Sequence, residues 1–185
     1  MEKIVNVNLI RCRRKSVGIQ IERSGEITVR APLRMPESEI MKVLESKRSW
    51  IEKTLQKIEL REQEPKLTRA EVDALADQAL KVIPPKVAER AKQIGVTYGR
   101  ITIRKQKSLW GSCSAKGNLN FNCLLMLCPE DVIDYVIVHE LCHRKELNHS
   151  PRFWAEVECL VPDWQEQRKW LRQNGGALMA KLPER

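Results

Sequence analysis

The chain contains three histidines, and all of them lie within eleven residues, at His139, His143 and His149. His139 and His143 are four residues apart, so on a helix with 3.6 residues per turn both rings leave the same face. One metal ion can then contact both imidazoles. The interval from His143 to His149 is long enough for the chain to leave the helix, turn and return a third imidazole.

Glu140 follows the first of these histidines in the pattern H-E-x-x-H. Its offset of one residue places the carboxylate beside the metal, where it can take a proton from a bound water. Three neutral imidazoles and a water suit Zn²⁺ best, and zinc lowers the pKa of that water to about 7. We therefore predict a hydrolase with one Zn²⁺ per chain, ligated by the three histidines, with Glu140 as the general base.

A glutamate on the following helix is an alternative third ligand. If Glu156 or Glu158 took that position, His149 would be left as an outer residue or would bind substrate. Phe153 and Trp154 precede these glutamates, and we expect the two rings to fix the His149 loop rather than to form a substrate pocket.

The histidine pair requires a helix, and the residues before it predict one. Pro129 and the two acidic residues after it are typical of a helical first turn. Residues 132–141 are apolar on nearly every side, so this helix must be buried. On it we expect Tyr135 and Cys142 to be packed core side chains.

Other periodic segments of the chain predict an α+β fold in two parts. The first, residues 1–64, is a βββα unit with a turn at Ser24-Gly25, and the second, residues 65–185, holds the histidines. The second part should begin with a capped helix from Thr68 to Val82, which stops at Pro84-Pro85 and is followed by a further helix to Ile94. Next come a strand at 100–106, a loop at 111–117 and a strand through Asn122 to Leu127. Two helices are expected after the histidine helix, one from Ser150 and one around Trp164 that ends at residues 174–176.

Composition indicates the setting of the protein. Hydrophobic residues make up 42% of the 185 residues, no apolar run is long enough for a membrane span, and the six cysteines form no C-x-x-C pair. We predict a cytoplasmic protein with free thiols, of unknown oligomeric state. Residues 86–128 carry a net charge of +7, out of +9 for the chain, so a nucleotide or nucleic acid is a possible partner of this basic segment.

Two segments together resemble a known family, the YgjP-like, SprT-related zinc metallopeptidases, which are small zincins. They are Leu109 to Asn122, LWGSCSAKGNLNFN, and Asp134 to Trp154, DYVIVHELCHRKELNHSPRFW. The resemblance implies a zincin-like catalytic domain, with His139, His143 and His149 as metal ligands and Glu140 as catalytic base. The metzincin pattern is also similar, but it has a glycine where this chain has Glu146.

A zincin usually holds an extended peptide along an edge strand by main-chain hydrogen bonds. Residues 117–123 are the edge that we expect. The candidate substrate-binding residues are Trp110, Gly117, Asn118, Leu119, Asn120 and Arg104.

These features are consistent with three different functions. The first is a zinc metallopeptidase. The second is a metal-dependent phosphohydrolase of the nucleoside triphosphate pyrophosphatase type, favoured by the basic segment but supported by no phosphate-binding glycine run. The third is a DNA-associated protease module, which a zinc ribbon or a long basic tail would favour, and the chain contains neither. The helical H-E-x-x-H pattern favours the peptidase.

Overall fold

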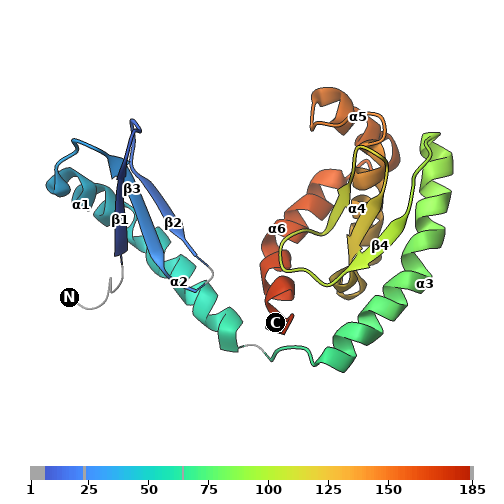
Figure 1. Ribbon diagram of the computed structural model, residues 1–185, viewed down its shortest axis with the longest axis horizontal. Coiled ribbons are helices and arrows are strands. Elements are labelled where there is room, and N and C mark those ends of the chain that lie inside the picture. The colour runs from blue at the N-terminus through green and yellow to red at the C-terminus, as the bar shows by residue number, and fades with distance from the viewer. Residues whose placement is uncertain (1–6, 23, 64, 184–185) are drawn as a thin grey trace. The chain divides into compact units, whose positions relative to one another are not determined.

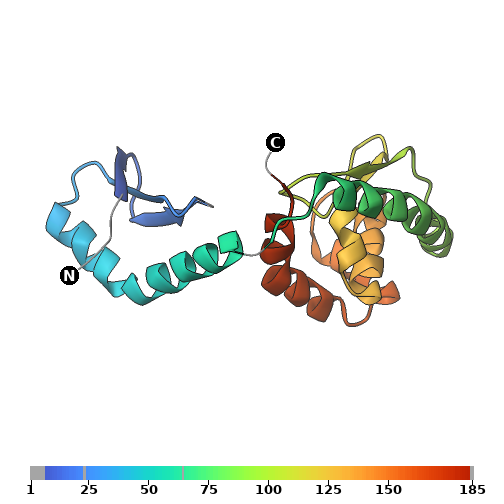
Figure 2. The same ribbon diagram turned by 90° about the horizontal axis from the view of Figure 1, so that it is seen from below.

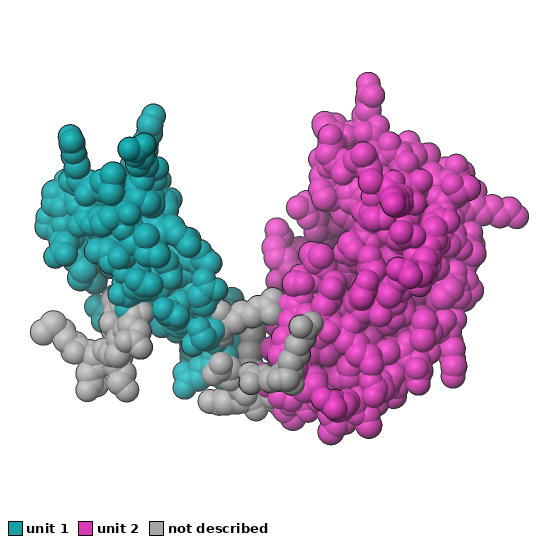
Figure 3. Space-filling model, in the orientation of Figure 1, with its two compact units in different colours: residues 1–64 teal, residues 65–185 magenta. Residues whose placement is uncertain are grey.

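A computed structural model describes residues 7–22, 24–63 and 65–183. The chain forms two compact units, residues 1–64 and residues 65–185 (Figure 3). Within the described residues, no helix is both long and apolar enough to cross a membrane. All six cysteines are free thiols, as predicted.

Unit 1 consists of a three-stranded sheet and two helices (Figure 1). Its strands are β1 (Val7–Cys12), β2 (Gly18–Ile21) and β3 (Ile27–Pro32). β3 is central, parallel to β1 and antiparallel to β2. Gly25, at a φ of 82°, makes the predicted turn between β2 and β3.

The helical part of the predicted βββα unit is two helices. They are α1 (Glu37–Ser46) and α2 (Arg48–Gln63), separated at Lys47. One face of the sheet packs on them through fully buried apolar side chains, which form a core of their own. Its buried members are Ile27, Val29, Ala31, Ile40, Leu44 and Ile51.

Unit 2 is built around one buried helix. Its elements are α3 (Arg69–Ile94), β4 (Ile101–Arg104), β5 (Gly111–Cys113), β6 (Leu119–Asn122), the short 3₁₀ helix η1 (Cys123–Leu127), α4 (Glu130–Cys142), α5 (Pro151–Leu160) and α6 (Trp164–Ala180). The sheet order is β4-β6-β5, with β4 parallel and β5 antiparallel to β6. α4 packs against α3, α5, α6 and β5 (Figures 1 and 2), which explains why it is apolar on nearly every side.

Two predicted helix ends are wrong. α3 runs without a break through Pro84 and Pro85, because its buried face, which includes Ile83 and Val87, packs along α4 and holds the helix together. α6 continues through residues 174–176. Gly175 is buried there, and a Cβ on it would lie 3.1 Å from Nε1 of Trp110, so this glycine admits an indole ring instead of ending the helix.

The loop predicted at 111–117 is confirmed only from residue 114, and the strand predicted through Asn122 to Leu127 ends at Asn122. Residues 111–113 form β5, and residues 123–127 form η1. Asn122 causes the change of direction, because its buried side chain accepts a hydrogen bond from the Leu124 N–H at 3.1 Å and caps η1. Its amide group donates to the carbonyls of Gln106 and Leu109.

Candidate metal centre

The end of α4 and the start of α5 bring the three histidines together. His139 and His143 lie on the last turn and at the C-cap of α4. The chain then turns, and Ser150 caps α5 by accepting a hydrogen bond from the Phe153 N–H at 3.3 Å. The Nε2 atoms of His149 and His139 are 3.0 Å apart, and the ligand atoms of all three histidines lie within 4.8 Å of one another.

The chemistry of this donor set fits a transition metal. Nδ1 of His143 lies 3.0 Å from the carbonyl of Glu146 and can donate its proton there, which leaves the Nε2 lone pair for a ligand. Two nitrogens on one tetrahedral Zn²⁺, at about 2.0–2.1 Å, would be roughly 3.3 Å apart, close to the spacing of His139 and His149. The geometry therefore needs little adjustment to hold an ion.

The surroundings of His139 and His149 favour the neutral form of these two imidazoles. Burial, with repulsion from the other two histidines and Arg168, lowers the pKa of His139 to about 3. The pKa of His149 is also lowered, by burial and then by His143 and Arg168. A neutral imidazole carries the lone pair that a metal requires.

Aromatic side chains of α5 and α6 support the histidine rings. Phe153 stacks on His143 with ring centroids 4.5 Å apart, and Trp154 stacks on His149 at 5.6 Å. Both rings contact His149, whose loop they were predicted to fix. The guanidinium of Arg168 lies 5.0 Å from the centre of the Trp154 ring. The sequence did not single out Arg168, and its spacing of four from Trp164 on one helix was the only available signal.

Glu140 of α4 is buried against β5. Its side chain is 6% exposed, and burial raises its pKa to about 8. A Cβ at Gly111 would lie 2.6 Å from Oε1 of Glu140 and 2.7 Å from its Cγ. Only a glycine at this point of β5 leaves room for the carboxylate.

Arg144, directly after His143, connects α4 to the turn between β5 and β6. Its Nε donates to the carbonyl of Thr97 at 3.0 Å, and Nη1 donates to that of Ala115 at 3.3 Å. At Gly117, where φ is 81°, a Cβ would lie 2.8 Å from Cζ of Arg144. The turn and the histidine helix are therefore held together by one side chain that the sequence analysis missed.

The candidate substrate-binding residues are placed differently from what we expected. Residues 117–123 are not an edge, because β6 pairs with a strand on both sides. Leu119 is fully buried, and the side chains of Asn118 and Asn120 make hydrogen bonds within the sheet region. The expected edge is therefore wrong, since a sequence does not reveal strand order.

The remaining two candidates lie on different parts of the sheet. Arg104 is on β4, the edge strand on the far side of β6 from β5, and donates to Asn120 at 3.2 Å. Trp110 directly precedes β5, the strand that contacts Glu140, and packs on Gly175. Leu119 and Asn120 lie on β6, which pairs with β5.

Other side chains near the histidines are packed in the core or paired with a residue outside the histidine cluster. Tyr135 is 4% exposed, burial raises its pKa to about 12, and Cys142 is fully buried, so both are packed as predicted. Glu156 forms an ion pair with Lys145 at 2.7 Å. Neither Glu156 nor Glu158 belongs to the histidine cluster in the described part of the chain.

Part of the basic segment is neutralised within the unit. Lys86 pairs with Glu130 at 2.7 Å, and Arg90 pairs with Asp134. A third cation, Lys105, pairs with an aspartate of α3. The charge of residues 86–128 therefore overstates the field that an anionic partner would meet.

Comparison with known proteins identifies the family. The YgjP-like, metallopeptidase domain family matches residues 15–76 and 61–174, and the chain belongs to this family. It is accordingly a peptide hydrolase of the metallopeptidase class, which uses a catalytic metal. A search of curated proteins gives no match.

Two solved structures are similar to half of the chain. The metallopeptidase zymogen abylysin of Pyrococcus abyssi is 23% identical, with a TM-score of 0.46, and the match covers 50% of this chain and 94% of that one. The metallopeptidase zymogen jannalysin of Methanocaldococcus jannaschii is 24% identical, with a TM-score of 0.45 and coverage of 50% and 95%.

Proposed function

We propose that the protein is a zinc peptidase that cleaves extended polypeptides, with one Zn²⁺ held by His139, His143 and His149. The observation that carries the proposal is the convergence of three imidazoles within 4.8 Å, one residue along α4 from a buried carboxylate. The family supports the peptidase class. When bound, the ion supplies a Lewis acid and lowers the pKa of a water.

Glu140 is the general base in this proposal. A cation beside its carboxylate lowers the pKa from the raised value of about 8, so the group becomes ionised and can accept a proton at neutral pH. Burial keeps the carboxylate out of bulk solvent, and Gly111 leaves the space that the carboxylate occupies. The same group can return the proton to the leaving amine.

The substrate in this proposal pairs with β5. The Asn122 N–H donates to the Trp110 carbonyl and the Ser114 N–H to the Asn118 carbonyl, so in the alternating antiparallel pattern the backbone groups of Gly111 and Cys113 point away from β6. No other strand pairs with this side of β5 in the described residues. An extended peptide hydrogen-bonded there would pass directly beside Glu140.

Glu140→Gln tests the proposal. The amide keeps the shape of the side chain but accepts no proton, so zinc content should stay at one per chain while peptide turnover falls by about 10² to 10⁴. Zinc is measured by atomic absorption, and turnover with an unfolded polypeptide, with and without chelator. Turnover within a few-fold of the parent would show that Glu140 is not the base.

A further inference from the structure

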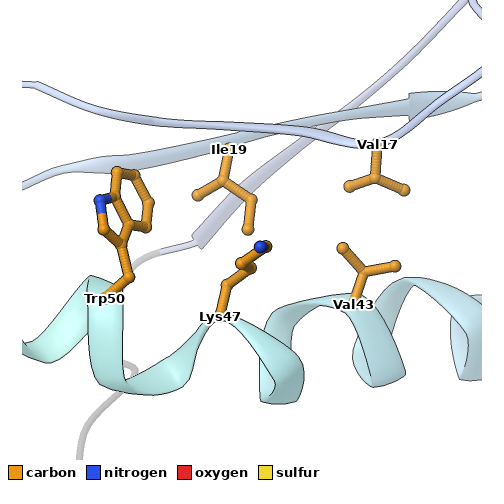
Figure 4. Close-up of a pocket in the computed structure, with 5 residues that line it drawn as sticks. All are labelled: Val17, Ile19, Val43, Lys47 and Trp50. Atoms are coloured by element: carbon orange, nitrogen blue, oxygen red, sulfur yellow. The ribbon is translucent and has the colours of Figure 1, made fainter.

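A groove in unit 1 lies between strand β2 and the helices beneath it. It encloses about 370 Å³ and is lined by Val17 and Ile19 on the sheet side and by Val43, Lys47 and Trp50 on the helix side (Figure 4). Trp50 is 49% exposed although it is one of the largest apolar side chains in the unit. Half-exposed tryptophans in a groove are typical of binding sites for other molecules.

The strand beside this groove has an open edge. β2 is an outer strand of the sheet, and nothing among the described residues pairs with its second side. The Glu22 N–H donates to the Glu26 carbonyl at 2.8 Å, which makes this a hydrogen-bonded pair. Antiparallel pairs alternate, so Gln20 and Gly18 also bond to β3, whereas the backbone groups of Ile19 and Ile21 point to the open edge.

Ile19 therefore contributes both a side chain to the groove and backbone groups to the open edge. Ile19 offers an N–H and a carbonyl at the edge, and its side chain points into the groove (Figure 4). A peptide added as a further strand would satisfy this backbone, and every second side chain of the peptide would face the groove.

Charge narrows the choice of peptide. Lys47 lies in the middle of the groove, between the apolar contacts of Val43 and those of Trp50 (Figure 4). It forms no ion pair with any other residue in the part of the chain that the structure describes. An acidic side chain at the middle position would complement it, with apolar side chains two residues before and after.

We infer that unit 1 binds an extended polypeptide by strand addition to β2, with an acidic side chain on Lys47 flanked at alternate positions by apolar side chains. The site is built from residues 17–50, so it contains none of the histidines and none of the residues proposed for catalysis. Binding there is independent of whether the chain hydrolyses peptides.

A labelled peptide tests this site. The probe is a fluorescein-labelled nonapeptide in which valine, glutamate and valine occupy alternate positions and threonine and serine fill the rest. It is titrated with full-length Glu140→Gln protein, which prevents cleavage, and binding is followed by fluorescence anisotropy. We expect saturable binding, weakened about tenfold or more by Lys47→Glu and by Trp50→Ala.

Matched controls separate the groove from the rest of the molecule. Lys42→Glu changes the same charge at an exposed position of α1 that does not line the groove, and it should leave the affinity within about twofold. A peptide with lysine in place of the glutamate should prefer Lys47→Glu over the parent. A peptide N-methylated at both the glutamate and the residue before it loses a backbone donor that faces β2 in either strand direction, and should bind more weakly. Circular dichroism melts verify that each variant is folded.

Three results would overturn the inference. The first is no saturable binding by the parent. The second is binding that Lys47→Glu and Trp50→Ala leave unchanged, which would place the peptide elsewhere, including the metal centre. The third is a concentration-dependent dimer in sedimentation velocity that Trp50→Ala abolishes, which would make a second copy of the chain the occupant.

Discussion

The metal-free protein should lose stability as the pH rises from 6.5 to 8, because of Glu140. The folded state keeps the Glu140 proton up to a pKa of about 8, whereas the unfolded chain releases it near 4.5. Between these values the folded state binds more protons, so its stability falls as pH rises. His139 has the opposite sign, since the unfolded chain binds its proton below 6.5 and the folded state only below about 3. Its contribution is lost as pH falls through that range.

Below pH 6.5 the lowered pKa values of His139 and His149 offset the Glu140 contribution, and above 6.5 the Glu140 contribution is the larger. From pH 6.5 to 8, at 1.36 kcal/mol per unit, Glu140 alone sets an upper limit of about 2 kcal/mol, and the histidines, still partly protonated in the unfolded chain, reduce the net loss to about 1 kcal/mol. Glu140 is 6% exposed, so solvent screens little of this difference. The measurement stops at pH 8 because several thiols titrate at higher pH and would add their own pH dependence. Burial raises the pKa values of Cys113 and Cys142, for example, in the folded state.

Urea unfolding in chelator is the assay, followed by tryptophan fluorescence, because four of the five tryptophans lie in unit 2. The parent should lose about 1 kcal/mol between pH 6.5 and 8, and Glu140→Gln should lose none of it. Zinc should also remove the decline, since a cation lowers the pKa of Glu140. A flat profile for the metal-free parent, or an equal slope in Glu140→Gln, would refute the reasoning.

Three further predictions concern the candidate metal centre and the residues around it. Gly111→Ala should keep zinc but lower turnover by about 10² or more, since the new methyl displaces Glu140, and loss of zinc together with activity would contradict this. His149→Ala should weaken zinc binding at least about tenfold in a competition titration, whereas Glu156→Ala leaves it unchanged, and the reverse result would make Glu156 the third ligand. Arg144→Ala should speed hydrogen exchange in the turn at 114–118 by removing the hydrogen bond to the Ala115 carbonyl, and unchanged exchange would show that the turn is held otherwise.

Local signals predicted the elements that carry the chemistry. The capping box of Thr68 and Glu71, Pro129 before α4, and the Ser150 cap of α5 all lie where the sequence indicated. Each signal is a contact within a few residues of the chain, which a sequence displays directly. The spacing of the histidines belongs to the same class, because a helix and one turn suffice to bring them together.

Long-range packing decided the features that were mispredicted. Pro84 would end an isolated helix, but the buried face of α3 outweighs the missing hydrogen bonds. Gly175 resembles a helix stop until Trp110, more than sixty residues earlier, is placed beside it. Strand order also depends on long-range contacts, since the sequence of residues 111–113 does not show that they form the edge strand beside Glu140.

The shortness of β5 limits what the proposed catalytic edge can select. Only Gly111 and Cys113 direct backbone groups outward, so a peptide gains about four hydrogen bonds there, each worth roughly 0.5–1.5 kcal/mol. Binding costs an estimated 4–15 kcal/mol or more in lost translational and rotational freedom, so these bonds alone hold a peptide weakly. Gly111 also presents no side chain, because the space that one would occupy is taken by Glu140. The space that the buried Glu140 requires thus removes a side chain from the proposed peptide-binding edge, so substrate selection there would come from contacts farther along the polypeptide.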